Sequence, residues 1–124
     1  MYSVHVVAQF RFVEWLILWI LETEGFIFEW DAGNEVKSLV KHSVPTEEVE
    51  EVFRGRIAAP LGVQESPPSD EERLGLIGPT NRGRLLHIVF TIRNGRVRPI
   101  SSRPAKRKER ILYEKIIREI TKRI

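Results

Sequence analysis

The stretch LLHIVFTIRNGRVRPIS, residues 85–101, decides the fold because two β-rich runs flank an Asn-Gly pair. Such a pair is the strongest short signal for a β-hairpin, since both of its residues accept a positive φ. The pattern therefore predicts paired strands over 85–92 and 96–101. Pro99 has no amide hydrogen to donate, so the second strand is expected at a sheet edge or with a bulge.

Two further strands are predicted before this hairpin, over 56–63 and 73–78. The polar segment 64–72 between them contains two adjacent prolines, which are typical of a loop. Successive strands joined in this way form an antiparallel meander. The aromatic run FIFEW, residues 26–30, is predicted as one more short strand.

Helices are predicted on both sides of the meander. Asp31 is expected to cap the first, over 33–41, and Thr46 with the glutamates that follow it opens the second. The last helix is predicted from about 104 to 123, with isoleucines on one face and most of its cations elsewhere. Helices before and after an antiparallel sheet define an α+β domain.

The apolar run FVEWLILWIL, residues 12–21, predicts another helix. A bilayer crossing needs about 20 apolar residues, so this run predicts no membrane span. Because the helix is apolar nearly all round, it must be buried under its own domain or against a second chain. No small-residue cleavage site follows it, and the protein is therefore expected in the cytoplasm.

Composition narrows the chemistry of this chain of 124 residues. The sequence contains no cysteine, so it has no disulfide framework and no thiol nucleophile. Its 3 histidines include no pair with metal-ligand spacing. We expect no metal and no cofactor. Residues 1–62 hold 5 Lys/Arg against 10 Asp/Glu, whereas 63–124 hold 15 against 7. The basic half is suited to a polyanion.

A series of short motifs resembles the BrnT-type toxins, which are ribonuclease toxins with a RelE-like fold from bacterial toxin–antitoxin pairs. The matching pieces are FEWD (28–31), KH (41–42), EEVEEVF (47–53), LIG (76–78), RGRLLHIVFT (82–91) and ISSRPAKRKERILYE (100–114). The resemblance implies a small antiparallel sheet packed with N-terminal helices and a C-terminal helix. It also implies a toxin domain over 25–124, preceded by an N-terminal extension over 1–24 that contains the hydrophobic helix.

Metal-independent RNA cleavage uses the 2′-OH as nucleophile, so the protein must supply a proton acceptor, a proton donor and positive charge on the phosphate. Arg84 and Arg103 suit the last task, because an arginine fork can meet two phosphate oxygens. Both fall near the end of the hairpin remote from its turn. The alternative is that they are solvated cations at the sheet edge.

Proton transfer has several candidates. The resemblance favours Lys41 and His42, which form a dipeptide that the family carries, although His42 is equally explained as a cation at a helix C-terminus. Tyr113 is a candidate proton donor or stacking residue, against the alternative of a core tyrosine. His87 lies within an apolar strand and is expected to be a hydrogen-bonded structural histidine.

The remaining candidates are contacts to RNA. Lys106, Arg107 and Arg110 form a basic run at the start of the last helix, and Arg82 precedes the hairpin. A solvated helix face is the alternative for that run. Trp30 is suited to stack on a base, or else to close the core beneath the first helix.

The resemblance implies the toxin of a type II toxin–antitoxin system, an endoribonuclease acting on RNA. It also implies a partner antitoxin, a BrnA-like protein of the ribbon-helix-helix type. One alternative is a catalytically inactive module of the same fold that binds nucleic acid or an antitoxin. A homodimer through the hydrophobic helix 12–21 is compatible with both.

Overall fold

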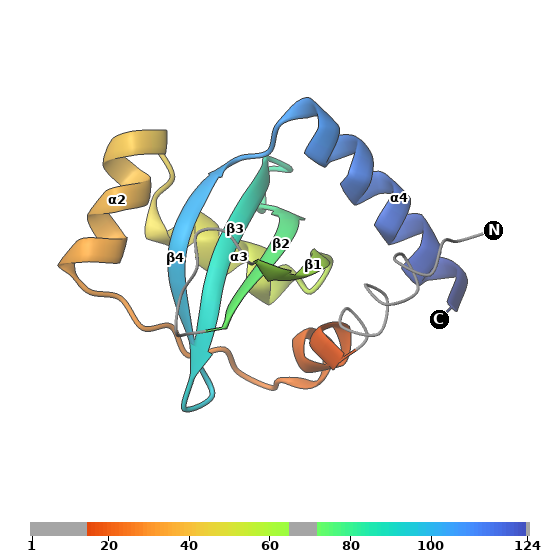
Figure 1. The fold of residues 1–124 in the computed structure, drawn as a ribbon, viewed down its shortest axis with the longest axis horizontal. Coiled ribbons are helices and arrows are strands. Elements are labelled where there is room, and N and C mark those ends of the chain that lie inside the picture. Colours follow the sequence, from red (N-terminus) through yellow and green to blue (C-terminus); the bar gives the residue numbers. More distant parts are fainter. Residues whose placement is uncertain (1–14, 65–71, 124) are drawn as a thin grey trace.

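The computed structural model describes residues 15–64 and 72–123. Three antiparallel pairings join its four strands in the simple order β1-β2-β3-β4. After a helical segment at 15–22, the elements are α2 (Ala32–His42), α3 (Thr46–Gly55), β1 (Ala59–Gln64), β2 (Arg73–Pro79), β3 (Leu85–Arg93), β4 (Arg96–Pro104) and α4 (Arg107–Arg123) (Figure 1). The predicted α+β class is confirmed.

The β3–β4 hairpin forms as the sequence predicts. Asn94 and Gly95 have φ of 52° and 75°, and Arg93 pairs with Arg96 across the turn. The register shifts beside Pro99, and β4 lies at the edge of the sheet. Both consequences expected of this proline, an edge strand and a bulge, are therefore present.

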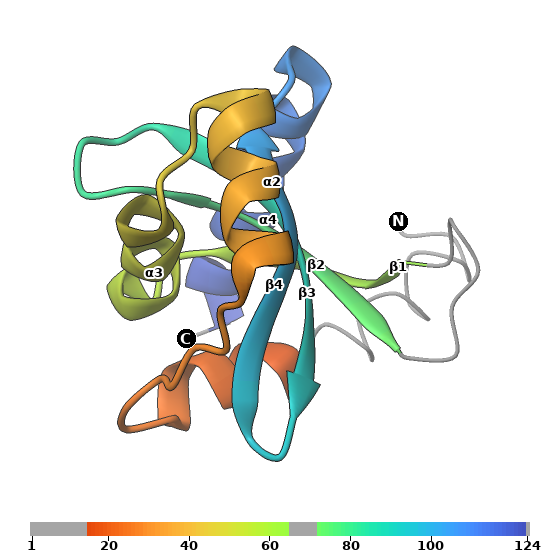
Figure 2. The same ribbon diagram turned by 90° about the vertical axis from the view of Figure 1, so that its left-hand side faces the viewer.

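One face of the sheet packs against α3 and the helical segment 15–22. Phe53 of α3 meets Phe90 of β3 edge to face, with ring centroids 5.0 Å apart. Figure 2 shows α3 beside the sheet. The fully buried apolar side chains of this core include Leu16, Val49, Val52, Phe53, Leu76, Leu86, Ile88, Phe90 and Val97.

The helical segment 15–22 belongs to this core on one side only. Leu16 and Ile20 are buried, and the Trp19 ring stacks over Phe90 at a centroid distance of 6.3 Å. Trp15 and Leu18 on the other side are exposed. Residues 12–14 of the predicted hydrophobic helix lie outside the described residues. Of the two kinds of burial expected for the segment, the structure shows burial under its own domain.

The predicted strand at 26–30 is wrong. It is reduced to a single parallel bridge between Phe28 and Val97, held by the amide of Glu29 on the Val97 carbonyl at 2.7 Å. The aromatic residues that suggested a strand instead fill the core, since the rings of Phe26 and Phe28 both pack against Phe53. The spacing of apolar residues alone does not distinguish an aromatic run that pairs as a strand from one that packs in the core.

Three element boundaries differ by three residues from the prediction, and one of them is the end of β4 at Pro104 rather than 101. The first strand begins at Ala59 rather than 56, because Arg56 closes α3 in the left-handed conformation with φ of 60°. The last helix begins at Arg107 rather than 104, because Pro104 still pairs with Leu86 in the sheet.

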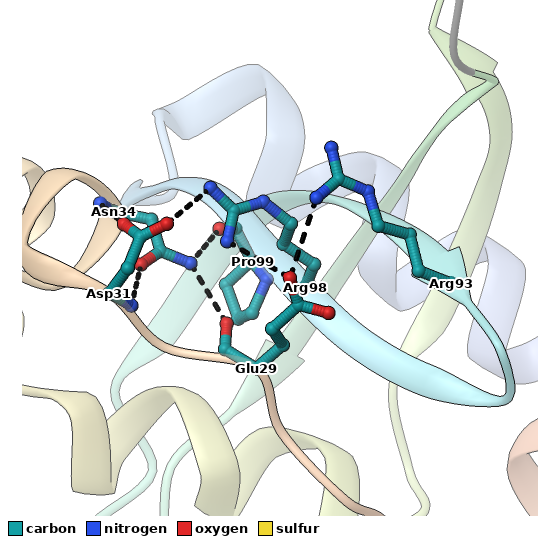
Figure 3. A network of polar contacts seen from close by, with 6 residues as sticks. All are labelled: Glu29, Asp31, Asn34, Arg93, Arg98 and Pro99. Atoms are coloured by element: carbon teal, nitrogen blue, oxygen red, sulfur yellow. Dashed lines mark hydrogen bonds and ion pairs between the residues drawn. The ribbon is translucent and has the colours of Figure 1, made fainter.

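A polar network fastens the start of α2 to β4 (Figure 3). Asp31 and Asn34 each accept the other's backbone N–H, at 3.0 and 2.7 Å, which confirms Asp31 as a cap. The amide group of Asn34 also donates to the carbonyl oxygens of Glu29 and Pro99. Arg98 reaches the Asp31 carboxylate at 2.8 Å. This anchoring sets where the far end of α2 lies.

Candidate nucleic-acid interface

Three segments meet at the end of the sheet opposite the Asn94-Gly95 turn: the end of α2, the β2–β3 loop and the β4–α4 junction (Figures 1 and 2). The amide of Ala105 donates to the Leu85 carbonyl at 2.9 Å, which fastens the junction to the start of β3. We call this region the basic end; its cations are Lys41, Arg82, Arg84, Arg103, Lys106, Arg107, Lys108 and Arg110.

Arg84 connects two of these segments. Its guanidinium donates to the carbonyl oxygens of Ser43 and His42, at 3.2 and 3.5 Å, and to the Glu48 carboxylate at 3.1 Å. The predicted residues Arg84, Lys41 and His42 are therefore brought to one place. The carbonyls at a helix C-terminus attract a cation, which explains why the arginine is held there.

Arg103 lies on β4 opposite His87 of β3. Its two terminal nitrogens meet the two carboxylate oxygens of Glu109, at 2.7 and 2.8 Å, in a bidentate ion pair. Nη1 also donates to the Pro104 carbonyl, and Nη2 to Nδ1 of His87. Arg103 and Arg84 do lie toward the same end of the hairpin, as counting back from the turn predicts.

Glu109 was not singled out from the sequence. It accepts the Lys106 amide N–H at 2.7 Å, and this contact is half of a capping box. The hydrogen bonds from Arg103 lower the pKa of Glu109 from 4.5 to about 2. A glutamate three residues after the N-cap of a basic helix is the sequence signal that could have identified it.

Burial is the main influence on the pKa of His87. Its side chain is 12% exposed, and desolvation lowers its pKa below 6.5 although the Glu109 charge acts in the opposite direction. A guanidinium can only donate, so the Arg103 contact with Nδ1 requires the tautomer that carries its proton on Nε2, whereas Nδ1 also lies 3.2 Å from Oε2 of Glu109. Nε2 is buried and has no hydrogen-bond partner among the described residues. The expected structural histidine is thus hydrogen-bonded through one nitrogen.

Tyr113 and Trp30 lie away from the arginines. The Tyr113 hydroxyl donates to the Ile57 carbonyl at 2.8 Å, just before β1 and across the sheet from Arg103, and burial raises its pKa. Trp30 packs against the core and donates from Nε1 to Glu50 at 2.8 Å. It precedes α2, whereas Lys41 lies at the other end of that helix. Trp30 therefore contacts the core, whereas Tyr113 is partly buried and lies outside the core cluster.

The cations at the start of α4 are open to solvent. Lys106 and Arg107 are exposed, as is Arg82 in the β2–β3 loop. Arg110 is exposed too, with one weak contact from Nη1 to the Ala105 carbonyl at 3.5 Å. Among the residues that the structure describes, the basic end therefore presents both exposed cations without a carboxylate partner and cations paired with carboxylates.

No group of three or more histidines and carboxylates among the described residues is arranged to hold a metal ion. Over the same residues, no helix has both the length and the apolar character to span a bilayer.

The described residues thus form an α+β fold whose antiparallel sheet has a basic end. Residues 30–109 match the family described as the ribonuclease toxin BrnT of type II toxin–antitoxin systems, and the chain belongs to this family. It is a family of endoribonucleases that act on RNA and are paired with an antitoxin.

Among solved structures, the crystal structure of the Brucella abortus ribonuclease toxin BrnT is similar, with a TM-score of 0.50 and 19% identity. The similarity covers 67% of this chain and 100% of the Brucella chain, and at this identity it shows the fold. No curated protein matches the chain.

Proposed function

We propose that the chain cleaves RNA without a metal, by attack of the 2′-OH at the basic end. The 2′ oxygen forms a bond to the adjacent phosphorus, and the bond from phosphorus to the 5′ oxygen breaks. The products are a 2′,3′-cyclic phosphate and a free 5′-OH. The observation that carries this proposal is the convergence of Arg84 with the Lys41-His42 dipeptide, through its hydrogen bonds to the His42 and Ser43 carbonyls.

The roles follow from the positions. Arg84 and Arg103 stabilise the charge that develops on the phosphate. Lys41 and His42, at the end of α2, take the proton from the 2′-OH and return one to the 5′ oxygen. Lys106, Arg107, Arg110 and Arg82 contact flanking phosphates. Tyr113 and Trp30 act from a distance, as parts of the packing that positions α4 and α2.

The test compares purified wild type with the Arg84→Ala, Arg103→Ala double variant on a defined RNA in EDTA. Arg96→Ala is the matched control, because Arg96 is an exposed arginine at the opposite end of the same hairpin. Cleavage by wild type and by the control, with loss in the double variant, supports the proposal. Equal cleavage by wild type, the double variant and the control would mean that Arg84 and Arg103 take no part in cleavage. Circular dichroism of each variant checks that the fold is kept.

A second candidate is a module of the same fold that binds nucleic acid or an antitoxin but does not cleave. The ion pair between Arg103 and Glu109 favours this second candidate, because an arginine already paired with a carboxylate binds a phosphate weakly. This candidate predicts RNA binding that weakens with salt, without cleavage.

We further propose a BrnA-like antitoxin of the ribbon-helix-helix type as the partner and the cytoplasm as the site of action. The division into an extension at 1–24 and a toxin domain at 25–124 also stays a proposal. Leu16 and Ile20 nevertheless complete the core of the domain that follows. A homodimer would use the exposed side of the helical segment, where Trp15 and Leu18 lie.

A further inference from the structure

The terminal N–H groups of Arg103 are all used inside the chain. A guanidinium carries five N–H donors, of which four are on the two terminal nitrogens. Nη1 donates to Glu109 at 2.7 Å and to Pro104 at 3.2 Å, and Nη2 donates to Glu109 and to His87, both at 2.8 Å. Within the described part of the chain, only the Nε hydrogen is left for another acceptor.

The Glu109 carboxylate occupies the edge that a phosphate would need. Bidentate binding of a phosphodiester uses two parallel N–H groups of the fork, in the same way as a carboxylate. In the free protein, Glu109 takes one oxygen to each terminal nitrogen of Arg103. A phosphate and Glu109 therefore cannot hold this edge of Arg103 at the same time.

We propose that Glu109 is an intramolecular competitor of RNA at Arg103: it holds the guanidinium in the free protein and is displaced by a phosphodiester. The inference rests on the proposed function, because it concerns an arginine of the proposed RNA site. The contact between Glu109 and Arg103 is therefore autoinhibitory. Arg103 can bind a phosphate only after this contact has broken.

Displacement by an anion fits the charges around the pair better than release by protonation. The charged groups that face Glu109 are Arg103 and Lys106, and His87 lies 3.2 Å from Oε2 of Glu109. Hydrogen bonds from Arg103 and from the Lys106 backbone N–H lower the pKa of Glu109 and keep it ionised at neutral pH. A second anion would be attracted by Lys106 and by the exposed Arg107. Glu109 lies in the first turn of α4 and its side chain is 21% exposed, so it can turn toward solvent without unpacking the core.

The decisive experiment measures RNA binding as a function of salt with the full chain. The probe is a single-stranded RNA with every ribose 2′-O-methylated, which cannot be cleaved through the 2′ oxygen. Glu109→Gln is compared with Glu114→Gln, which removes the same charge from an exposed position on the same helix. We expect Glu109→Gln to bind about fivefold tighter than the control, since Arg103 gains a phosphate partner. We also expect its slope of log affinity against log salt to steepen by about 0.7, the value for one added contact to a single strand.

Two more variants separate geometry from charge. Glu109→Asp keeps the charge but is too short for the bidentate contact, so it should share part of the gain. Adding Arg103→Gln to Glu109→Gln should abolish the gain, because the released arginine is then missing. If Glu109→Gln binds no tighter than Glu114→Gln, or more weakly while still folded by circular dichroism, Glu109 positions Arg103 rather than competing for it, and the proposal is wrong.

A readout without RNA tests the contact itself. Phenylglyoxal modifies accessible arginines, and mass spectrometry locates the product. In wild type, Arg103 should react more slowly than the exposed Arg96, and Glu109→Gln should remove the difference. Equal rates in wild type would overturn the proposal. If Arg103 is protected but neither wild type nor Glu109→Gln binds RNA, the proposed function fails and the competition fails with it. If wild type cleaves RNA and the variant shows no gain, the competition alone fails.

Discussion

Gly78 of β2 faces Val52 of α3 so closely that a β-carbon on Gly78 would lie 2.6 Å from Cγ1 of Val52 and 2.8 Å from the β-carbon of Ala58. Both neighbours are buried. The glycine therefore sets how near α3 approaches the sheet. The same helix carries Glu48, which holds Arg84, so this packing distance also bears on the basic end.

Gly78→Ala should lower the free energy of unfolding by about 1–3 kcal/mol, the usual cost of adding a methyl group to a full core. Urea unfolding of the variant measures it. The control is Gly55→Ala at the end of α3, where an added β-carbon meets nothing within 4 Å. A loss at Gly55 as large as that at Gly78 would mean that the close approach is not the cause.

Arg56→Ala should loosen the helical segment 15–22. Arg56 donates to the carbonyls of Ile20, Leu21 and Glu24 and lies over the Phe26 ring. Because these contacts are partly exposed, we expect a loss of about 1–2 kcal/mol in unfolding free energy. Arg54→Ala is the control, since Arg54 also lies over a phenylalanine but, among the described residues, otherwise pairs only with Glu50 at the surface. Its cost should stay below about 0.5 kcal/mol; equal costs would contradict this account.

Asn34→Asp should destabilise the joint between α2 and β4 shown in Figure 3. The substitution removes both amide donors and sets a carboxylate against the carbonyls of Glu29 and Pro99. Leaving such groups unpaired in a buried place costs about 2–3 kcal/mol. Thermal unfolding of the variant, beside Asp31→Asn as a milder change at the exposed end of the network, measures it. The prediction fails if Asn34→Asp is the milder of the two.

The contribution of the β4–α4 junction to the free energy of unfolding should decrease at acidic pH. Folding lowers the pKa of Glu109 from 4.5 to about 2, chiefly through the hydrogen bonds from Arg103. A depressed carboxyl pKa contributes stability that is complete above 4.5 and is lost as the pH falls toward 2. Glu109→Gln should therefore show a shallower fall of unfolding free energy than wild type over that range. Parallel curves for the two proteins would show that the pair contributes nothing to folding.

The features predicted best from the sequence are those that depend on residues next to one another in the chain. Asn94 and Gly95 require the hairpin whatever surrounds them, and Pro99 can only disturb the strand it lies in. Counting along that hairpin also placed Arg84 and Arg103 at one end. The run at 26–30 was mispredicted because its aromatic side chains are used for packing and not for strand pairing.

The partners of the two arginines could not be predicted from the sequence. Glu48 comes from α3, 36 residues before Arg84, and Glu109 comes from the first turn of α4. Both pairings depend on how the helices pack on the sheet, which periodicity does not specify. Whether a cation is free for phosphate is therefore a tertiary property, and it separates the exposed Arg107 from the paired Arg103.

Attack by the 2′-OH at the basic end can be measured with two matched oligonucleotides in EDTA. The first is an RNA that the protein cuts, and the second carries a single 2′-deoxy residue immediately before the mapped cut. The account predicts a 2′,3′-cyclic phosphate or 3′-phosphate end and a 5′-OH from the first, and no cut at that bond in the second. Cleavage of the 2′-deoxy bond at an undiminished rate, or a product with a 5′-phosphate, would contradict it.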